Sequence, residues 1–76
     1  MMTLAELEIG QKGIVKSIST ADGMHRRFRD IGLIENTIVE CVGKSPAGNP
    51  KAFLIRGAVI AIRIEDCCGI FVTSEE

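Results

Sequence analysis

Residues 25–39, HRRFRDIGLIENTIV, constrain the fold more than any other part of the chain. Met24, Phe28 and Ile31 recur at positions i, i+4 and i+7, the spacing of one apolar stripe on a helix. The arginines between them fall on the opposite, solvent side. Because nearly all of the remaining sequence has strand character, this pattern predicts one short amphipathic helix, residues 22–31, inserted early in a small sheet.

Both ends of this expected helix carry boundary signals. Asp22 is the expected N-cap, since its carboxylate can accept the free backbone N–H groups of the first turn. Gly32 suits the left-handed position after the helix, and Leu33 can then pack back on Phe28. The chain is therefore expected to leave the helix sharply and enter a strand.

Period-two patterns and turn residues divide the rest of the chain into five expected strands. They are residues 13–19, 37–43, 52–56, 59–64 and 69–73. Val39 and Cys41 are expected to share one face of the second strand. Ile14 and Ile18 are expected to share a face of the first, although Lys16 interrupts the alternation.

The connections between these strands have turn chemistry of their own. Residues 45–50 contain two prolines and a Gly-Asn pair, which predicts a loop. Residues 56–58 predict a tight turn around a glycine, and residues 65–68 predict one helical or 3₁₀ turn. Five strands in a flat sheet would expose one apolar face and two edges, whereas rolling the sheet up hides both. The expected fold is therefore mainly β, a small five-stranded, partly open barrel.

Composition limits the class of protein further. The 76 residues suffice for one domain, residues 1–76, with an aliphatic core that has no Trp or Tyr. The net charge of −1 gives no basic field to attract nucleic acid or anionic lipid. No signal peptide is expected, and the longest strongly apolar run, residues 58–62, is too short to insert in a bilayer. Three cysteines indicate a reducing cytosol rather than a disulfide scaffold.

Residues along nearly the whole chain also fit the pattern of a known family. They are Leu4, Leu7, Gly10, Gly13-Ile14-Val15, Arg27, Gly32-Leu33, Gly48-Asn49-Pro50, the run 57–63, and Ile70-Phe71-Val72. In this order and spacing the chain resembles the ferrous iron transport protein A (FeoA) family. It departs at Glu35 and Asn36, where the family commonly has Pro-Gly, and at Phe28, where the family often has Leu.

The resemblance implies an SH3-like barrel and a non-enzymatic role. Members of that family are small cytoplasmic partners of the membrane GTPase-permease that imports ferrous iron in bacteria. Binding to this permease would recruit them to the inner face of the membrane. The same domain occurs at the C-terminus of iron-dependent repressors. A regulatory module acting with such a repressor is therefore the alternative function.

The residues themselves also favour a binding module over an enzyme. The eight glycines fit neither a GxxxxGK[ST] nor a GxGxxG pattern. The chain has a single histidine, His25, and histidine is the side chain that most often serves in general acid–base catalysis. We therefore predict no catalytic residue. Binding of proline-rich peptides or single-stranded nucleic acid is disfavoured because both need surface aromatics that this chain lacks. A homodimer through an incompletely paired barrel edge is a further alternative.

The helix and the residues after it contain the candidate partner-binding surface. Its expected members are Arg26, Arg27, Arg29, Leu33 and Ile34. Three arginines on a near-neutral protein suit an acidic partner surface, and an adjacent apolar side chain suits an interface anchor. The alternative is an ordinary solvated helix face.

The cysteines and the histidine are the candidate metal ligands. The candidates are Cys67, Cys68 and His25, for a weakly bound transition metal ion; no cofactor is expected to be required. Neighbouring residues of a strand point to opposite faces, and the chain lacks CxxC and HxxxH spacing. Structural packing of Cys41 and of at least one of the adjacent pair is therefore the favoured interpretation.

Overall fold

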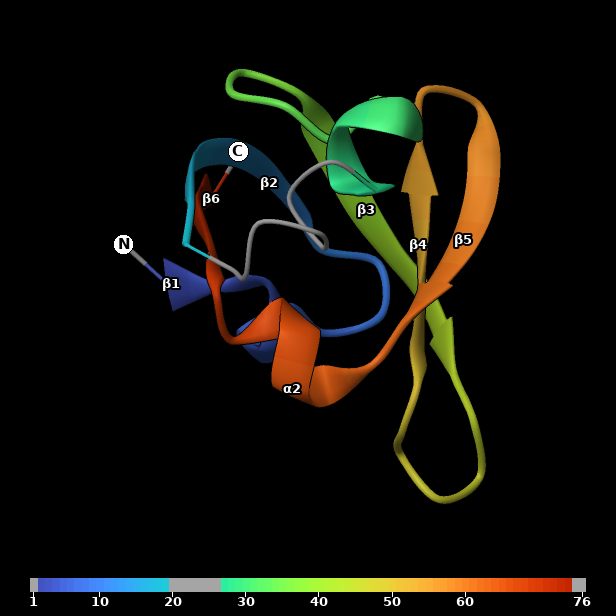
Figure 1. Ribbon diagram of the computed structural model, residues 1–76. Helices are drawn as coiled ribbons and strands as arrows, with labels where there is room; N and C mark the ends of the chain where they lie inside the picture. Colours follow the sequence, from blue (N-terminus) through green and yellow to red (C-terminus); the bar gives the residue numbers. More distant parts are fainter. Residues whose placement is uncertain (1, 20–26, 75–76) are drawn as a thin grey trace.

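The computed structural model describes residues 2–19 and 27–74, and its six strands form one curved antiparallel sheet (Figure 1). The strands are β1 (Met2–Thr3), β2 (Lys12–Ile18), β3 (Ile38–Lys44), β4 (Lys51–Ile55), β5 (Ala58–Ile62) and β6 (Ile70–Ser74). The 3₁₀ turn η1 (Leu4–Glu6) follows β1, and helix α2 (Ile64–Cys67) joins β5 to β6. The strand order is β1-β6-β2-β3-β4-β5.

The mainly β class is confirmed, and all five expected strands are present within two residues of their expected ends. The strand count of five was wrong, because β1 pairs with β6 and adds a sixth strand. A strand of two residues is too short to show a period-two pattern in the sequence. Within the described ranges β1 and β5 do not pair with each other, so the sheet stays open at that point.

The helix expected over residues 22–31 lies partly outside the described residues, which include neither Asp22 nor Met24. Its described part is helical at residues 27–30, between β2 and β3. The expectation of a single helix was incomplete, since α2 forms where one helical turn was predicted. No helix in the described part of the chain is both long and apolar enough to cross a membrane.

A bulge in β2 corrects the expected facing of its side chains. Val15 pairs with Val72 and Ile18 pairs with Ile70, but the register shifts between Val15 and Ser17. Because a bulge inserts one extra residue, Val15 and Ile18 come to share the core face, and Ile14 turns outward. The prediction that Ile14 and Ile18 share a face was therefore wrong, and the interruption noted at Lys16 marks the bulge.

The core lies within the curve of the sheet and consists of aliphatic, Phe and Cys side chains. Its buried members are Leu4, Leu7, Val15, Phe28, Leu33, Val39, Cys41, Phe53, Ile55, Ile62, Cys67, Ile70 and Val72. The alternation predicted for β3 is confirmed, since Val39 and Cys41 are fully buried while Ile38 is 52% exposed. Each large apolar side chain buried in this way contributes about 1.5–3 kcal/mol.

The end of the helical segment has the expected glycine stop. Gly32 has φ +87°, and the Leu33 N–H donates to the Phe28 carbonyl at 2.8 Å, as in a Schellman motif. The Gly32 carbonyl also accepts from the Thr37 hydroxyl at 3.2 Å and from Arg56 Nε at 3.1 Å. These bonds tie the end of the helical segment to Thr37 and to Arg56.

Two polar side chains hold the remaining short elements in place. Lys51 Nζ donates to the carbonyls of Ala5 and Leu7, at 2.7 and 2.8 Å, and so ties the η1 region to β4. Asn49 Oδ1 accepts from the N–H of Ile64, the first residue of α2, at 3.1 Å. The loop before β4 therefore positions the start of α2.

Candidate functional site

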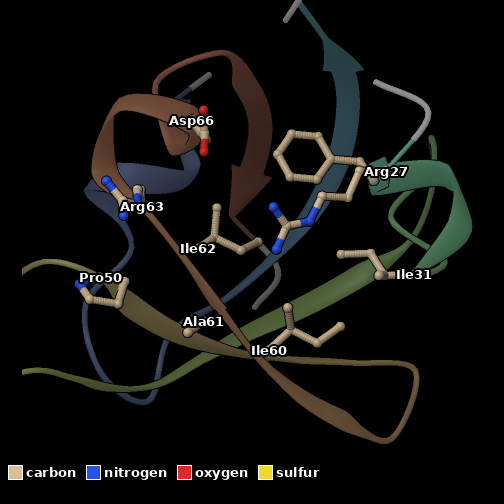
Figure 2. A pocket seen from close by; sticks show the side chains of 9 residues that line it. Arg27, Ile31, Pro50, Ile60, Ala61, Ile62, Arg63 and Asp66 are labelled. Atoms are coloured by element: carbon tan, nitrogen blue, oxygen red, sulfur yellow. The ribbon is translucent and has the colours of Figure 1, made fainter. Parts of the chain in front are cut away.

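A cleft of about 280 Å³ lies between the helical segment, β5 and the start of α2, and we call it the β5 cleft (Figure 2). Its apolar lining comes from Phe28, Ile31, Pro50, Ile60, Ala61 and Ile62. Its charged lining comes from Arg27, Arg63 and Asp66. Three separate parts of the sequence therefore meet around one opening.

The sheet topology keeps this cleft accessible. Ile60 and Ile62 point inward from β5 by the period-two rule, and Ile31 follows the helical segment on the facing side. Figure 2 shows Ile31 and Ile60 near one end of the cleft, and Pro50, Arg63 and Asp66 toward the other. Since β5 is the last strand of the sheet, no further described strand closes the opening.

The charged side chains give the cleft a net positive border. Arg27 and Arg63 are exposed, and Asp66 is half-buried. Figure 2 shows Arg27 extending over the opening toward β5. An apolar floor with two arginines and one carboxylate suits a ligand that is apolar in its centre and acidic at its periphery.

The structure divides the expected partner-binding surface in two. Arg27 lines the β5 cleft, whereas Arg29 lines a different cavity, of about 370 Å³, together with Leu33 and Ile34. We call it the Arg29 cavity; its other lining residues are Ser17, Ile18 and Glu35. Residues two apart on a helix point in nearly opposite directions, so these arginines cannot act on one contact surface.

The two apolar members of the expected surface, Leu33 and Ile34, differ in their exposure. Leu33 has no exposed area, because it packs in the core, so its assignment as a surface anchor is corrected. Ile34 is 42% exposed and remains available at the surface. Arg26 lies outside the described residues.

The candidate metal ligands are not gathered into a site by the described structure. Cys67 is fully buried, its Sγ lies 3.8 Å from the Ile62 carbonyl oxygen, and burial raises its pKa to about 12. Its neighbour Cys68 is exposed, and His25 lies outside the described residues. Among residues 2–19 and 27–74, no three His, Cys, Asp or Glu side chains cluster closely enough to hold a metal ion. Cys67 and Cys41 instead pack in the core, as the favoured interpretation expected.

Sequence reasoning missed most of the β5 cleft. Pro50 lies in the loop before β4, whereas Arg63 is the N-cap of α2 and Asp66 lies within it, and no local pattern predicts that this loop and this helix meet. The available signal was the period-two pattern of residues 59–64, which places Ile60 and Ile62 on one face of the strand.

Comparison with known proteins identifies the family. No curated protein matches the sequence. The family model described as the FeoA domain matches residues 2–74. The chain belongs to the FeoA family.

Solved structures of FeoA proteins have the same fold. The solution structure of FeoA from Chlorobium tepidum superimposes with a TM-score of 0.92 and 27% identity, covering 96% of this chain and 70% of that one. FeoA from Stenotrophomonas maltophilia, crystallised with zinc, gives 0.83 and 28%, covering 96% and 91%. That protein is described as a prokaryotic SH3 domain protein and a candidate activating factor for ferrous iron transport. The SH3-like expectation for this FeoA domain is therefore supported.

A manganese-dependent transcriptional repressor contains a similar domain. It superimposes with a TM-score of 0.87 and 24% identity, covering 97% of this chain but only 41% of that one. At this identity the likeness concerns the fold alone. The same fold is thus found in FeoA proteins and in part of a longer manganese-dependent repressor.

Proposed function

We propose that this FeoA domain is a non-enzymatic accessory protein of bacterial ferrous iron uptake. In this proposal it acts in the cytoplasm and docks on the cytosolic part of the membrane GTPase-permease for ferrous iron. Membership of the FeoA family and the description of the Stenotrophomonas relative support this function. The observation that carries the proposal is the β5 cleft, whose apolar floor and positive border suit an acidic protein surface.

Docking at this cleft would act on the permease through differential affinity. A binding protein changes a conformational equilibrium only if it binds one state more tightly than the other. The proposal is that the permease surface complementary to the β5 cleft is fully formed in one state of the GTPase. The FeoA domain would then stabilise that state, with no reacting group of its own.

The chain offers a matched pair of variants for testing the site. Arg27→Glu reverses a charge at the β5 cleft, and Arg29→Glu reverses a charge on the same helical segment at the Arg29 cavity. Both arginines are exposed, so both variants should fold. We expect Arg27→Glu to weaken binding to the purified cytosolic part of the permease by about tenfold, or about 1.4 kcal/mol. Arg29→Glu should change it less than about twofold.

Isothermal titration calorimetry measures both affinities, with circular dichroism to verify folding. The opposite order, in which Arg29→Glu weakens binding and Arg27→Glu does not, would transfer the docking site to the Arg29 cavity. Absence of binding by the unmodified chain would refute the proposed function. An assay of GTP hydrolysis with and without the chain then tests whether docking changes the activity of the partner.

The proposed function requires no bound metal ion in this chain. A zinc-bound relative makes a transition metal a reasonable question, but the described residues do not fit such a site. A buried thiol with a raised pKa is a poor ligand at neutral pH, since the thiolate is the species that binds metal. Equilibrium dialysis with zinc and ferrous iron, using Cys67→Ser/Cys68→Ser as the control, tests for weak binding.

The second candidate function is a regulatory module acting with an iron-dependent repressor. The fold likeness to the manganese-dependent repressor favours it. The two functions predict different partners, because one requires a membrane GTPase and the other a DNA-binding protein. Affinity purification of the tagged chain under native conditions, followed by mass spectrometry of the bound protein, distinguishes them.

A further inference from the structure

We propose that the β5 cleft binds its partner by strand addition, with an extended, acidic segment of the partner pairing with the free edge of β5. This inference rests on the proposed function and specifies how the contact with the permease is made. The evidence is the hydrogen-bonding pattern of β5, the composition of that strand, and the side chains beside it.

The backbone of β5 has polar groups directed away from the sheet. The Arg56-Gly57 turn has φ values of +50° and +85°, as a two-residue hairpin requires, so Ile55 and Ala58 form a hydrogen-bonded pair. Antiparallel pairs alternate, so Ala58, Ile60 and Ile62 direct their N–H and C=O groups to β4. Those of Val59 and Ala61 point outward, and no residue in the described ranges pairs with that side.

The composition of β5 does not protect this edge. Exposed edges are usually blocked by a charge, a proline or a bulge. The sequence of β5, Ala-Val-Ile-Ala-Ile, has no charge and no proline, and its register with β4 is unbroken. As the terminal strand of the described sheet, β5 has no neighbour on this side, and Val59 is 66% exposed.

The opposite edge of the sheet, formed by β1, offers little backbone for pairing. There, β1 has only two residues, and the Thr3 N–H already donates to the Glu6 carboxylate at 2.7 Å. Among the described residues, the edge strand β5 has five residues and the other edge strand, β1, has two. Strand addition is therefore expected at β5.

The surrounding side chains indicate the chemistry of the added strand. Its inward residues would enter the cleft against Phe28 and Ile31, which calls for apolar side chains at alternate positions. Arg27 and Arg63 border the same cleft, so an acidic residue at either end of the added segment would gain an ion pair. A second copy of β5 has no charged residue to offer these arginines, which favours a different partner over a homodimer.

Ala61→Pro tests the pairing directly. Proline removes only the outward N–H at this position and leaves the β4 ladder intact, because edge strands tolerate proline where the N–H faces solvent. Ala61→Ser is the matched control, since it changes the side chain and keeps the N–H. With the cytosolic part of the permease as the probe, we expect Ala61→Pro to bind at least about tenfold more weakly than Ala61→Ser, because the two variants differ in the outward N–H.

Amide hydrogen exchange gives a second measurement that needs no variant. Formation of the complex should slow exchange of the Val59 and Ala61 amides at least about tenfold, while Ile60 is already protected by β4. Unchanged exchange at both outward amides, or full affinity of folded Ala61→Pro, would overturn strand addition and leave the proposed function standing. Absence of any binding by the unmodified chain would overturn both. A dimer of the free chain that Ala61→Pro dissociates would assign the edge to a second copy and also overturn the proposal.

Discussion

Stability at alkaline pH should depend on one buried thiol. Cys67 has no exposed area, and burial raises its pKa from 9.0 to about 12. In the unfolded chain the same thiol loses its proton near its ordinary pKa. Between these two values the folded state retains a proton that the unfolded state has released, so the free energy of unfolding falls as pH rises. The contribution is complete below pH 9 and is lost as pH increases toward 12.

The size of the effect follows from the two pKa values. Within this window the free energy of unfolding decreases by about 1.4 kcal/mol per pH unit, which amounts to about 2 kcal/mol between roughly pH 8 and pH 10.5. Urea denaturation followed by circular dichroism at these pH values measures the loss. The chain contains no tyrosine, so no phenol titrates over the same range.

Two variants separate this thiol from the other titrating groups. Cys67→Ala leaves a small void and lowers stability at pH 8, but its pH dependence should be shallower by about 2 kcal/mol over the same range. Cys68→Ala removes an exposed thiol and should retain the dependence of the unmodified chain. If Cys67→Ala and the unmodified chain lose stability in parallel, the thiol at position 67 is not responsible and the reasoning fails.

The hydrogen bonds of the Thr37 and Lys51 side chains lead to two further predictions. Thr37→Val keeps the shape of a buried side chain but removes its bonds to the Gly32 carbonyl and from the Ile34 N–H, both 3.2 Å, so unfolding should become easier by about 1–3 kcal/mol. Urea denaturation measures this, and an unchanged midpoint would mean that these bonds contribute nothing net. Lys51→Met should cost about 1.5–3 kcal/mol by removing an ammonium group from two carbonyls, with Lys44→Met as the exposed control. Equal effects of the two lysine variants would contradict the role given to Lys51.

Local patterns predicted the elements of this fold because each is specified by neighbouring residues. Alternation at Val39 and Cys41 gave the buried face of β3, and Gly32 followed by Leu33 gave the helix end with its observed bond to Phe28. At Asn36, one of the two positions where the family commonly has Pro-Gly, φ is +70°, a left-handed conformation that Asn tolerates better than most residues.

The errors arose where the structure depends on pairing partners distant in sequence. The bulge in β2 moves Ile14 to the outer face, and its position is set by the register with β6 rather than by residues nearby. Leu33 was expected at the surface as well as against the helix, and only the complete core shows that it is enclosed.

The candidate site depends even more on contacts between residues that are distant in the sequence. Helical spacing alone separates Arg27 from Arg29, so the division of the arginines between two cavities could have been predicted. The meeting of Arg27 with Arg63 and Asp66 could not, because it depends on the path of the chain through three intervening strands, β3, β4 and β5, and their connections. Sequence therefore supplied the charges of the surface but not their grouping.

The unequal lengths of the two edge strands, β1 and β5, also limit how large an assembly formed by strand pairing can become. Filament growth by strand pairing needs two free ends on each unit, one to accept and one to be accepted. Among the described residues, the β1 edge is only two residues long and its Thr3 N–H already donates to Glu6, so β5 is the one long edge available for pairing. Association by strand pairing at β5 therefore ends with one neighbour, because the resulting pair has no second long edge among the described strands.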